Sequence, residues 1–304
     1  MIKEVLEKTD ALEEKIQALL AEEEKTEEIK VLQEEKKKLL DSCKDLEPGD
    51  RVFLARHPRR PHVEDFVSAL FTDFFEQKGD HLYDEDRSIY GGIARFHGRP
   101  VTVLGHRKGR TVEENLSCNF GMTCPEGYRK AKRLMEQAEK FDRPIITFVD
   151  TPGAYPGLEA EQHGQGEAIA KNLAFMSSLH VPVIAVVTGE GSSGGALGIC
   201  VANKILMLEN AIYSVLSPEG FATILWKDSS RAAEAAKVMK LTAKDLKEAN
   251  VADEVVPESL GGAQDDPESL YKALDQALEK TLAYYEGMSR HEIRKDRLSK
   301  FRNI

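Results

Sequence analysis

The clearest hydrophobic pattern in this chain is an apolar, β-branched run that leads directly into a cluster of glycines. Residues 183–187 (VIAVV) have the length and composition of a strand that is buried on both faces. The glycine-rich turn after this run ends with Gly194 and Gly195, and helical composition begins at Ala196. Such a turn can aim the free N–H groups of a helix start at an anion. Glycines that only permit close packing of the helix on the strand are the alternative interpretation.

The same order of elements occurs twice in the chain. The first unit is a predicted helix over 126–141, a strand over 144–149 and a glycine loop over 150–157, and the second spans 168–199. The first loop contains Gly153, Ala154 and Tyr155. Because α/β folds place their ligands at the carboxyl ends of parallel strands, we expect both loops to open on one side of the fold.

The remaining hydrophobic pattern predicts further strands and helices. Two short β-rich runs, 89–96 and 100–105, flank His97-Gly98 and predict a hairpin. Four large apolar residues at helical spacing, which we expect in the core face of one helix, are Phe66, Leu70, Phe74 and Phe75. Additional strands are predicted over 204–208, 211–215 and 253–256, and additional helices over 221–226, 229–239 and 242–249.

The two ends of the chain are charge-rich and helical in composition. Residues 1–47 predict a hairpin of two helices joined around Glu24–Thr26, and residues 263–304 predict a C-terminal helical segment. Residues 48–262 then form one central domain. The hairpin has a narrow apolar stripe that should pack on the central domain or on a partner chain, and a solvated appendage is the alternative.

Composition narrows the functional classes. The chain has 304 residues, 41% of them hydrophobic, and a net charge of -10, which argues against a general nucleic-acid binder. No apolar run reaches membrane-spanning length, and no lysine of the phosphate-binding loop type comes after the glycines. The four cysteines are scattered and lack zinc-type spacing, which favours reduced thiols, no metal site and a cytoplasmic location: Cys43, Cys118, Cys124 and Cys200.

Two basic clusters are candidate anion contacts. One is Arg56, His57, Arg59 and Arg60, and the other is Arg107, Lys108 and Arg110. The second cluster could receive the phosphates of a nucleotide-like ligand. Solvated charge is the commoner outcome for such runs.

Seven motifs in order carry a resemblance to a known family. They are GGIARFHGRPVTVLGHRKGR (91–110), NFGM (119–122), PEGYRKA (125–131), RPIITFVDTPGAYPG (143–157), GQGEAIAKNL (164–173), GEGSSGGALGI (189–199) and YSVLSPEGFATILW (213–226). Together they resemble the α subunits of bacterial acetyl-CoA carboxylase carboxyltransferases, densely over about 50–262. Ser192 and Cys200 depart from the pattern, because the family is expected to have glycine at both positions.

The resemblance implies a fold, an activity and partners. The fold would be α/β and crotonase-like (ClpP/crotonase), a spiral of ββα units with the N-terminal hairpin and the C-terminal helical segment attached. The activity would be transfer of a carboxyl group from carboxybiotin, held on a separate carrier protein, to acetyl-CoA. The product would be malonyl-CoA, in the committed step of fatty acid biosynthesis. Partners would be a carboxyltransferase β subunit in an α2β2 heterotetramer, the biotin carboxyl carrier protein and biotin carboxylase. Zinc would belong to the β subunit, with no metal on this chain.

The resemblance also assigns roles to the two glycine loops. Backbone donors at Gly194, Gly195, Gly153 and Ala154 would be catalytic, because they would stabilise developing negative charge. Gly194, Gly195 and Tyr155 would bind the carboxybiotin. The freed biotin could itself take the proton of acetyl-CoA, so no general base on the chain is required.

Two alternatives stay open at this point. A stand-alone crotonase-type acyl-CoA hydratase or decarboxylase would use carboxylates near the loops, with Glu190 and Glu219 as the best candidates. Glu161 and His163 are weaker ones. A non-catalytic scaffold subunit is the second alternative, since Ser192 alters the glycine turn.

Overall fold

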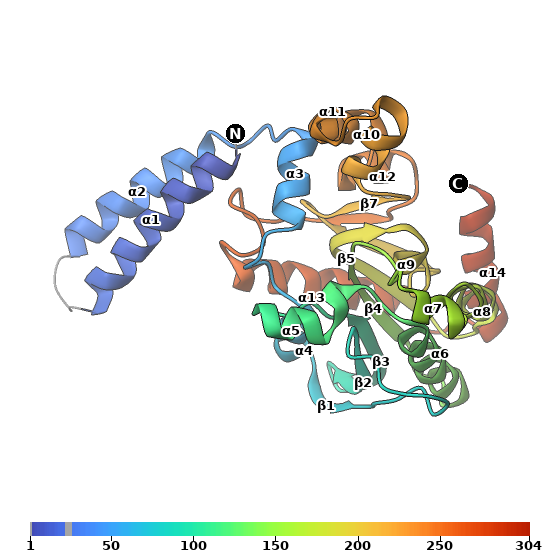
Figure 1. Ribbon diagram of the computed structural model, residues 1–304. Coiled ribbons are helices and arrows are strands. Elements are labelled where there is room, and N and C mark those ends of the chain that lie inside the picture. The colour runs from blue at the N-terminus through green and yellow to red at the C-terminus, as the bar shows by residue number, and fades with distance from the viewer. Residues whose placement is uncertain (1, 22–25) are drawn as a thin grey trace.

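The computed structural model describes residues 2–21 and 26–304, which are organised around one mixed β-sheet (Figure 1). Within these residues seven strands lie in the spatial order β1-β2-β3-β4-β5-β6-β8, and β7 pairs with the end of β5. Strands β1 to β3 are antiparallel, and β3 to β8 run parallel. The strands are β1 (Thr72–Glu76), β2 (Ile89–Phe96), β3 (Arg99–His106), β4 (Ile145–Thr151), β5 (Val183–Ser192), β6 (Lys204–Leu208), β7 (Ile212–Ser214) and β8 (Glu254–Val256).

Helices connect and cover these strands. The α-helices are α1 (Ile2–Ala21), α2 (Thr26–Asp41), α3 (Pro48–Ala55), α4 (Val63–Leu70), α5 (Val112–Ser117), α6 (Pro125–Lys140), α7 (Leu158–Gln162), α8 (Gln165–Ser178), α9 (Ser193–Leu197), α10 (Pro218–Trp226), α11 (Ala232–Met239), α12 (Ala243–Glu248), α13 (Pro267–Tyr284) and α14 (Arg290–Arg302). Two short 3-10 helices are η1 (Asn119–Gly121) and η2 (Ser229–Arg231). Helix α6 packs with α8, and α4 packs with α13.

The core lies where the predicted apolar runs meet. Strands β4 and β5 are buried at every residue, as expected for strands covered on both faces. The predicted face of α6 is fully buried, and it consists of Ala131, Leu134, Met135 and Ala138. Phe66 of α4 stacks on Phe148 of β4 with ring centroids 5.4 Å apart. The apolar runs therefore identified the two buried strands, and the helical spacing identified the buried face of α6.

The predicted hairpin is also present, but one predicted helix was too long. Strands β2 and β3 join through His97 and Gly98, both at positive φ, which is the backbone of a type I′ turn. The prediction that Phe74 and Phe75 continue a helix was wrong, because α4 ends at Leu70 and these residues lie on β1. Pairing of β1 with β2 overrides the local spacing, and it leaves Phe75 68% exposed.

The N-terminal hairpin of α1 and α2 extends away from the sheet (Figure 1). Leu12 and Ile16 of its apolar stripe are buried, while Leu19, Ile29, Leu32 and Leu39 are half-buried. Helix α1 packs against α2. At its base the Lys36 ammonium lies 2.9 Å from the carboxylate of Asp265. Most of the predicted connection around Glu24–Thr26 lies outside the described residues, which resume at Thr26, the first residue of α2. Over the described residues, we find no helix with the length and apolar character needed to cross a bilayer.

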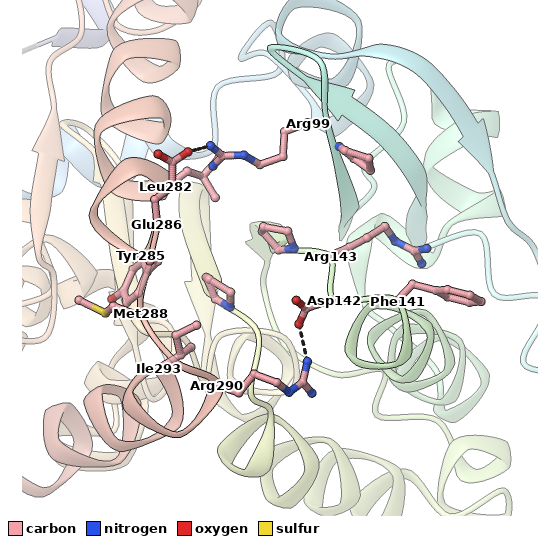
Figure 2. A pocket seen from close by; sticks show the side chains of 14 residues that line it. Arg99, Phe141, Asp142, Arg143, Leu282, Tyr285, Glu286, Met288, Arg290 and Ile293 are labelled. Atoms are coloured by element: carbon pink, nitrogen blue, oxygen red, sulfur yellow. Dashed lines mark hydrogen bonds and ion pairs between the residues drawn. The ribbon is translucent and has the colours of Figure 1, made fainter.

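The C-terminal helices close over the amino ends of the central strands. A cavity of about 390 Å³ lies between these strand starts and α13–α14. Figure 2 shows the side chains that line it. Two ion pairs join the helices to the body here, Arg99 with Glu286 and Arg290 with Asp142. This cavity lies at the edge of the sheet opposite to the two glycine loops, which extend from the strand carboxyl ends.

A fully buried arginine anchors α14. The guanidinium of Arg297 donates to the carbonyls of Met176, Leu179 and Val181 and to the side-chain oxygen of Asn203. Burial lowers the pKa of Arg297 to about 10. These bonds supply donors to the buried carbonyls of Leu179 and Val181, between α8 and β5, while the Met176 carbonyl also accepts the N–H of Leu179.

We expect Arg297→Leu to lower the free energy of unfolding by about 3 kcal/mol, because several buried carbonyls lose their donor. Urea denaturation of the isolated chain measures this effect. Arg302→Leu, at the exposed end of the same helix, should change stability by less than about 0.5 kcal/mol. Equal effects of the two substitutions would show that the buried bonds are not the anchor.

Candidate functional site

The two glycine loops meet at the carboxyl ends of β4 and β5. A Cβ atom built on Gly195 would lie 2.5 Å from the backbone nitrogen of Ala154 and 2.5 Å from the carbonyl carbon of Gly153. Only a residue without a side chain fits so close to another backbone. The prediction that both loops open on one side of the fold is therefore confirmed.

The second loop turns abruptly from strand into helix. Ser193, the first residue of α9, has a left-handed backbone with φ of 57°. Gly194 is half-buried, and a Cβ there would meet nothing closer than Ile169 at 3.8 Å. The first-turn N–H groups of a helix have no acceptor within the helix. The amides of Gly194 and Gly195 lie in this first turn.

The first loop offers fewer free donors than the sequence predicted. The N–H of Gly153 already donates to Thr151 Oγ1 at 3.1 Å, and the Thr151 hydroxyl donates back to the Gly153 carbonyl at 2.8 Å. An anion would have to displace this internal bond to reach Gly153. The amide nitrogen of Ala154 lies against Gly195 where the two loops meet, and it is the other candidate donor of this loop.

A mostly apolar cavity opens beside the start of α9. Its volume is about 280 Å³. Its lining combines small polar residues of the turn with apolar side chains from later segments: Ser193, Gly194, Leu197, Tyr213, Ser214, Val215, Leu246 and Val251. A pocket with an apolar wall and a few polar groups on one side suits a small ring system that carries one polar edge.

Tyr155 lies on a different cavity. The structure places its side chain with Tyr83, Glu126 and His163 around a space of about 330 Å³. Its ring also packs on Gly157, where a Cβ would lie 2.3 Å from Tyr155 Cε1. The predicted site residues Gly153, Ala154, Gly194 and Gly195 are thus brought together, while the Tyr155 side chain lies apart from them.

The carboxylates that a hydratase would need are held by one arginine. Arg56 donates to Glu190 at 2.6 and 2.9 Å and to Glu219 at 2.8 Å. Burial alone would raise the pKa of Glu219, but the hydrogen bond from Arg56 lowers it. The weaker candidates lie elsewhere, since His163 bonds Glu126 at 3.0 Å on the Tyr155 cavity and Glu161 is exposed.

Members of both basic clusters are bound to acidic partners. Arg60 and Glu258 form a buried pair at 2.5 Å, and Lys108 lies 2.6 Å from Asp150. Arg107 and Arg110 form ion pairs with Glu64 and Asp65. Arg60 is buried and Lys108 half-buried in their pairs, whereas Arg107 and Arg110 stay partly exposed, as the solvated-charge interpretation expects. Sequence spacing gave no sign of the partners.

The two departures from the family pattern lie under the cavity floor. Ser192 is buried and pairs with Ser214 where β7 joins β5. Cys200 is fully buried next to Tyr213, and burial raises the pKa of its thiol to about 11. Neither residue replaces Gly194 or Gly195 at the turn itself.

His106 is a buried residue of the site that we did not single out from the sequence. It ends β3 and is 1% exposed, with the backbone of Gly195 and Phe148 beside its ring. Burial lowers the pKa of His106 to about 4. A neutral imidazole therefore supports the underside of the glycine turn at physiological pH.

Comparisons with known proteins identify the family. A family model described as acetyl co-enzyme A carboxylase carboxyltransferase-like matches residues 2–304. The chain belongs to this family. It is 52% identical over 280 residues to a Bacillus cereus protein named acetyl-coenzyme A carboxylase carboxyl transferase subunit alpha, covering 92% of this chain and 86% of the relative. The protein of that name from Bacillus subtilis is 53% identical over 278 residues, with 91% and 86% covered.

Solved structures share the fold of this family member. The transcarboxylase 12S core matches with a TM-score of 0.59 at 21% identity, over 73% of this chain and 41% of that one. A Pseudomonas malonate decarboxylase hetero-tetramer solved with coenzyme A matches with a TM-score of 0.57 at 17% identity, over 69% and 84%. The predicted crotonase-like α/β fold is confirmed.

The buried His106 should make the folded protein less stable at acidic pH. Its pKa is about 4 when folded and about 6.5 when unfolded, so below pH 6.5 the unfolded chain binds a proton that the folded chain refuses. The free energy of unfolding should fall by up to about 1.4 kcal/mol per pH unit between pH 6.5 and 4. Above pH 6.5 His106 should make no further contribution to the pH dependence of stability.

Denaturation of the isolated chain at several pH values measures the slope. His106→Leu should flatten it, whatever the variant's absolute stability, while His291→Gln at the exposed start of α14 should leave it unchanged. An unaltered slope in His106→Leu would mean that the imidazole is not held neutral by burial.

Proposed function

We propose that this chain is the α subunit of an acetyl-CoA carboxyltransferase, which moves a carboxyl group from carboxybiotin on a carrier protein to acetyl-CoA and so forms malonyl-CoA. The family match over residues 2–304 carries this proposal. The pairing of the two glycine loops beside an apolar cavity supports it, because the reaction needs donors for developing negative charge.

Gly194, which lines the cavity, and the neighbouring paired loops would hold one face of carboxybiotin. When bound, carboxybiotin supplies the carboxyl group, and after its loss the ureido nitrogen can accept the proton of acetyl-CoA. The amides of Gly194, Gly195 and Ala154 would donate to the ureido oxygen as it gains charge. Each such donor typically contributes roughly 3–4 kcal/mol to lowering the barrier. Leu197 and Val251 would contact the apolar part of the ring system.

Gly153 and Tyr155 take supporting roles in this proposal. Gly153 has φ of 146° and carries the chain past Gly195, while its own N–H bonds Thr151. Tyr155 packs on Gly157 and thereby supports the first loop. Direct contact of Tyr155 with biotin stays a prediction, since its cavity is the one shared with His163.

A partner subunit would cover the open side of the site. Val215, which lines the cavity, is 78% exposed, and α10, which follows it in the chain, carries Ile224 at 64% and Leu225 at 57% exposure. Grouped apolar exposure of this kind marks interaction surfaces. We propose the carboxyltransferase β subunit as the occupant, in an α2β2 assembly that works with the biotin carboxyl carrier protein and biotin carboxylase in the cytoplasm. We keep residues 1–47, 48–262 and 263–304 as the proposed division into domains.

Two other functions are less well supported. In a hydratase, Glu190 and Glu219 would have to activate water, but Arg56 bonds both carboxylates. A non-catalytic scaffold would leave no reason for the close approach of the glycine loops at the cavity.

Gly195→Ala should lower malonyl-CoA formation by the αβ complex about a hundredfold or more, because the added methyl group would force the two loops apart. Gly166→Ala is a matched control, since a Cβ there meets nothing within 4 Å. It should keep turnover within about twofold. Initial rates on complexes verified by gel filtration measure both. Parental turnover by an assembled Gly195→Ala complex would refute the proposed role of the turn.

Activity should depend on the partner. The isolated chain should form no malonyl-CoA, and the addition of a cognate β subunit should give a stable, active hetero-oligomer. Ile224→Lys should weaken assembly at least about tenfold, because it places a charge in the apolar contact. Val31→Lys, on the exposed hairpin, should leave assembly unchanged. Turnover by the chain alone would contradict the half-site proposal.

A further inference from the structure

The two central strands lose their even register just before the glycine loops. Val149 of β4 lies opposite Val187 of β5, but the next pair is Thr151 opposite Gly191. Residues 188–190 of β5 therefore face Asp150 alone. Extra residues in one strand make a bulge, which bends the strand and redirects the backbone beyond it. In this chain the redirected backbone is the glycine turn of residues 191–195.

The carboxylate of Asp150 fills this bulge. Its Oδ1 accepts the N–H of Glu190 at 2.9 Å. Gly189 leaves room for it, since a Cβ there would lie 2.4 Å from the same oxygen. The ammonium of Lys108 lies 2.6 Å from Oδ1 and balances the charge. Gly121 lies over the Lys108 stem, where a Cβ would be 3.0 Å from Cγ.

Other contacts hold the same bulge from its far side. Arg60 donates to the carbonyl of Thr188, and Arg56 holds the Glu190 side chain. Each of the three bulge positions therefore contacts a charged side chain from a distant segment. Thr188 contacts Arg60, Gly189 contacts Asp150, and Glu190 contacts Arg56. A bulge that served only to end the sheet would not require so many buried charges, each of which is costly to desolvate.

We propose that Asp150, balanced by Lys108, is a positioning residue that sets how the two glycine loops face each other. The inference rests on the proposed function and deepens it. Asp150 is three residues ahead of Gly153 on one loop, and through the Glu190 amide it fixes the start of the other. Its Oδ1 is bonded to Lys108 and to the Glu190 N–H, so this oxygen holds the two strand ends in place. It acts through the position of the donors in both loops.

The kinetic test measures the reverse reaction of the assembled αβ complex. In this reaction malonyl-CoA gives its carboxyl group to free biotin, and acetyl-CoA is formed. Asp150→Ala should lower kcat about a hundredfold, since small displacements of catalytic groups have effects of this size. KM for malonyl-CoA should stay within about threefold of the parental value, because the two loops bind biotin in this proposal and not malonyl-CoA. Asp150→Asn keeps an oxygen for the Glu190 amide and should recover kcat to within about tenfold of the parent.

A matched ion pair at the base of the hairpin provides the control. Lys36 and Asp265 lie 2.9 Å apart and are about as buried as Lys108 and Asp150. Asp265→Ala should change kcat less than about twofold. Equal loss of kcat in Asp150→Ala and Asp265→Ala would overturn the proposal, and so would an Asn variant that is no better than Ala.

A second measurement does not depend on catalysis. Amide hydrogen exchange of the isolated chain should become at least about tenfold faster over residues 190–195 in Asp150→Ala and stay unchanged there in Asp265→Ala. Unchanged exchange in Asp150→Ala would overturn the positioning role. If the parental complex shows no carboxyl transfer while exchange responds as expected, the proposed function fails and the positioning of the loops stands.

Discussion

The candidate site depends on the close approach of two backbones at Gly195. No side chain fits between this residue and the Gly153–Ala154 peptide, where a Cβ would lie 2.5 Å away. The approach requires β4 and β5 to be adjacent and parallel, so that both loops emerge at one edge of the sheet. It also requires the end of β5 to bend, because the strands no longer match residue for residue beyond Val187. The fold thus serves to hold two loops at contact distance.

Charge pairing completes this edge of the sheet. Lys108 with Asp150, Arg60 with Glu258, and Arg56 with two glutamates are buried or half-buried pairs around the ends of the strands. Buried charges persist in proteins when they are paired and hydrogen-bonded. None of these charged side chains is among the described residues that line the cavity at α9.

The site is open where a partner would complete it. The exposed side chains of Val215 and Leu197 line the cavity, and the N-terminal hairpin stands apart from that region in Figure 1. The C-terminal helices close the opposite edge, through Arg297 and the ion pairs shown in Figure 2. The C-terminal helices thus cover one edge of the sheet apart from the cavity in Figure 2, and the glycine loops lie at the other.

Local sequence determined most of the elements and the two loops. Continuous apolar runs gave β4 and β5, helical spacing gave the buried face of α6, and glycine placement gave the turns, because each of these depends on neighbours along the chain. Ordered motifs were enough to indicate the family.

Only the tertiary structure decided which distant groups meet. Arg56 captures Glu190 and Glu219, 134 and 163 residues away, and Lys108 reaches Asp150 across 42 residues. Phe74 and Phe75, which the spacing placed on a helix, lie on β1 because this strand pairs with β2. The Tyr155 side chain lines a different cavity from the one beside α9. Periodicity and spacing carry no information on such contacts, since they arise from the order of strands and the burial that this order imposes.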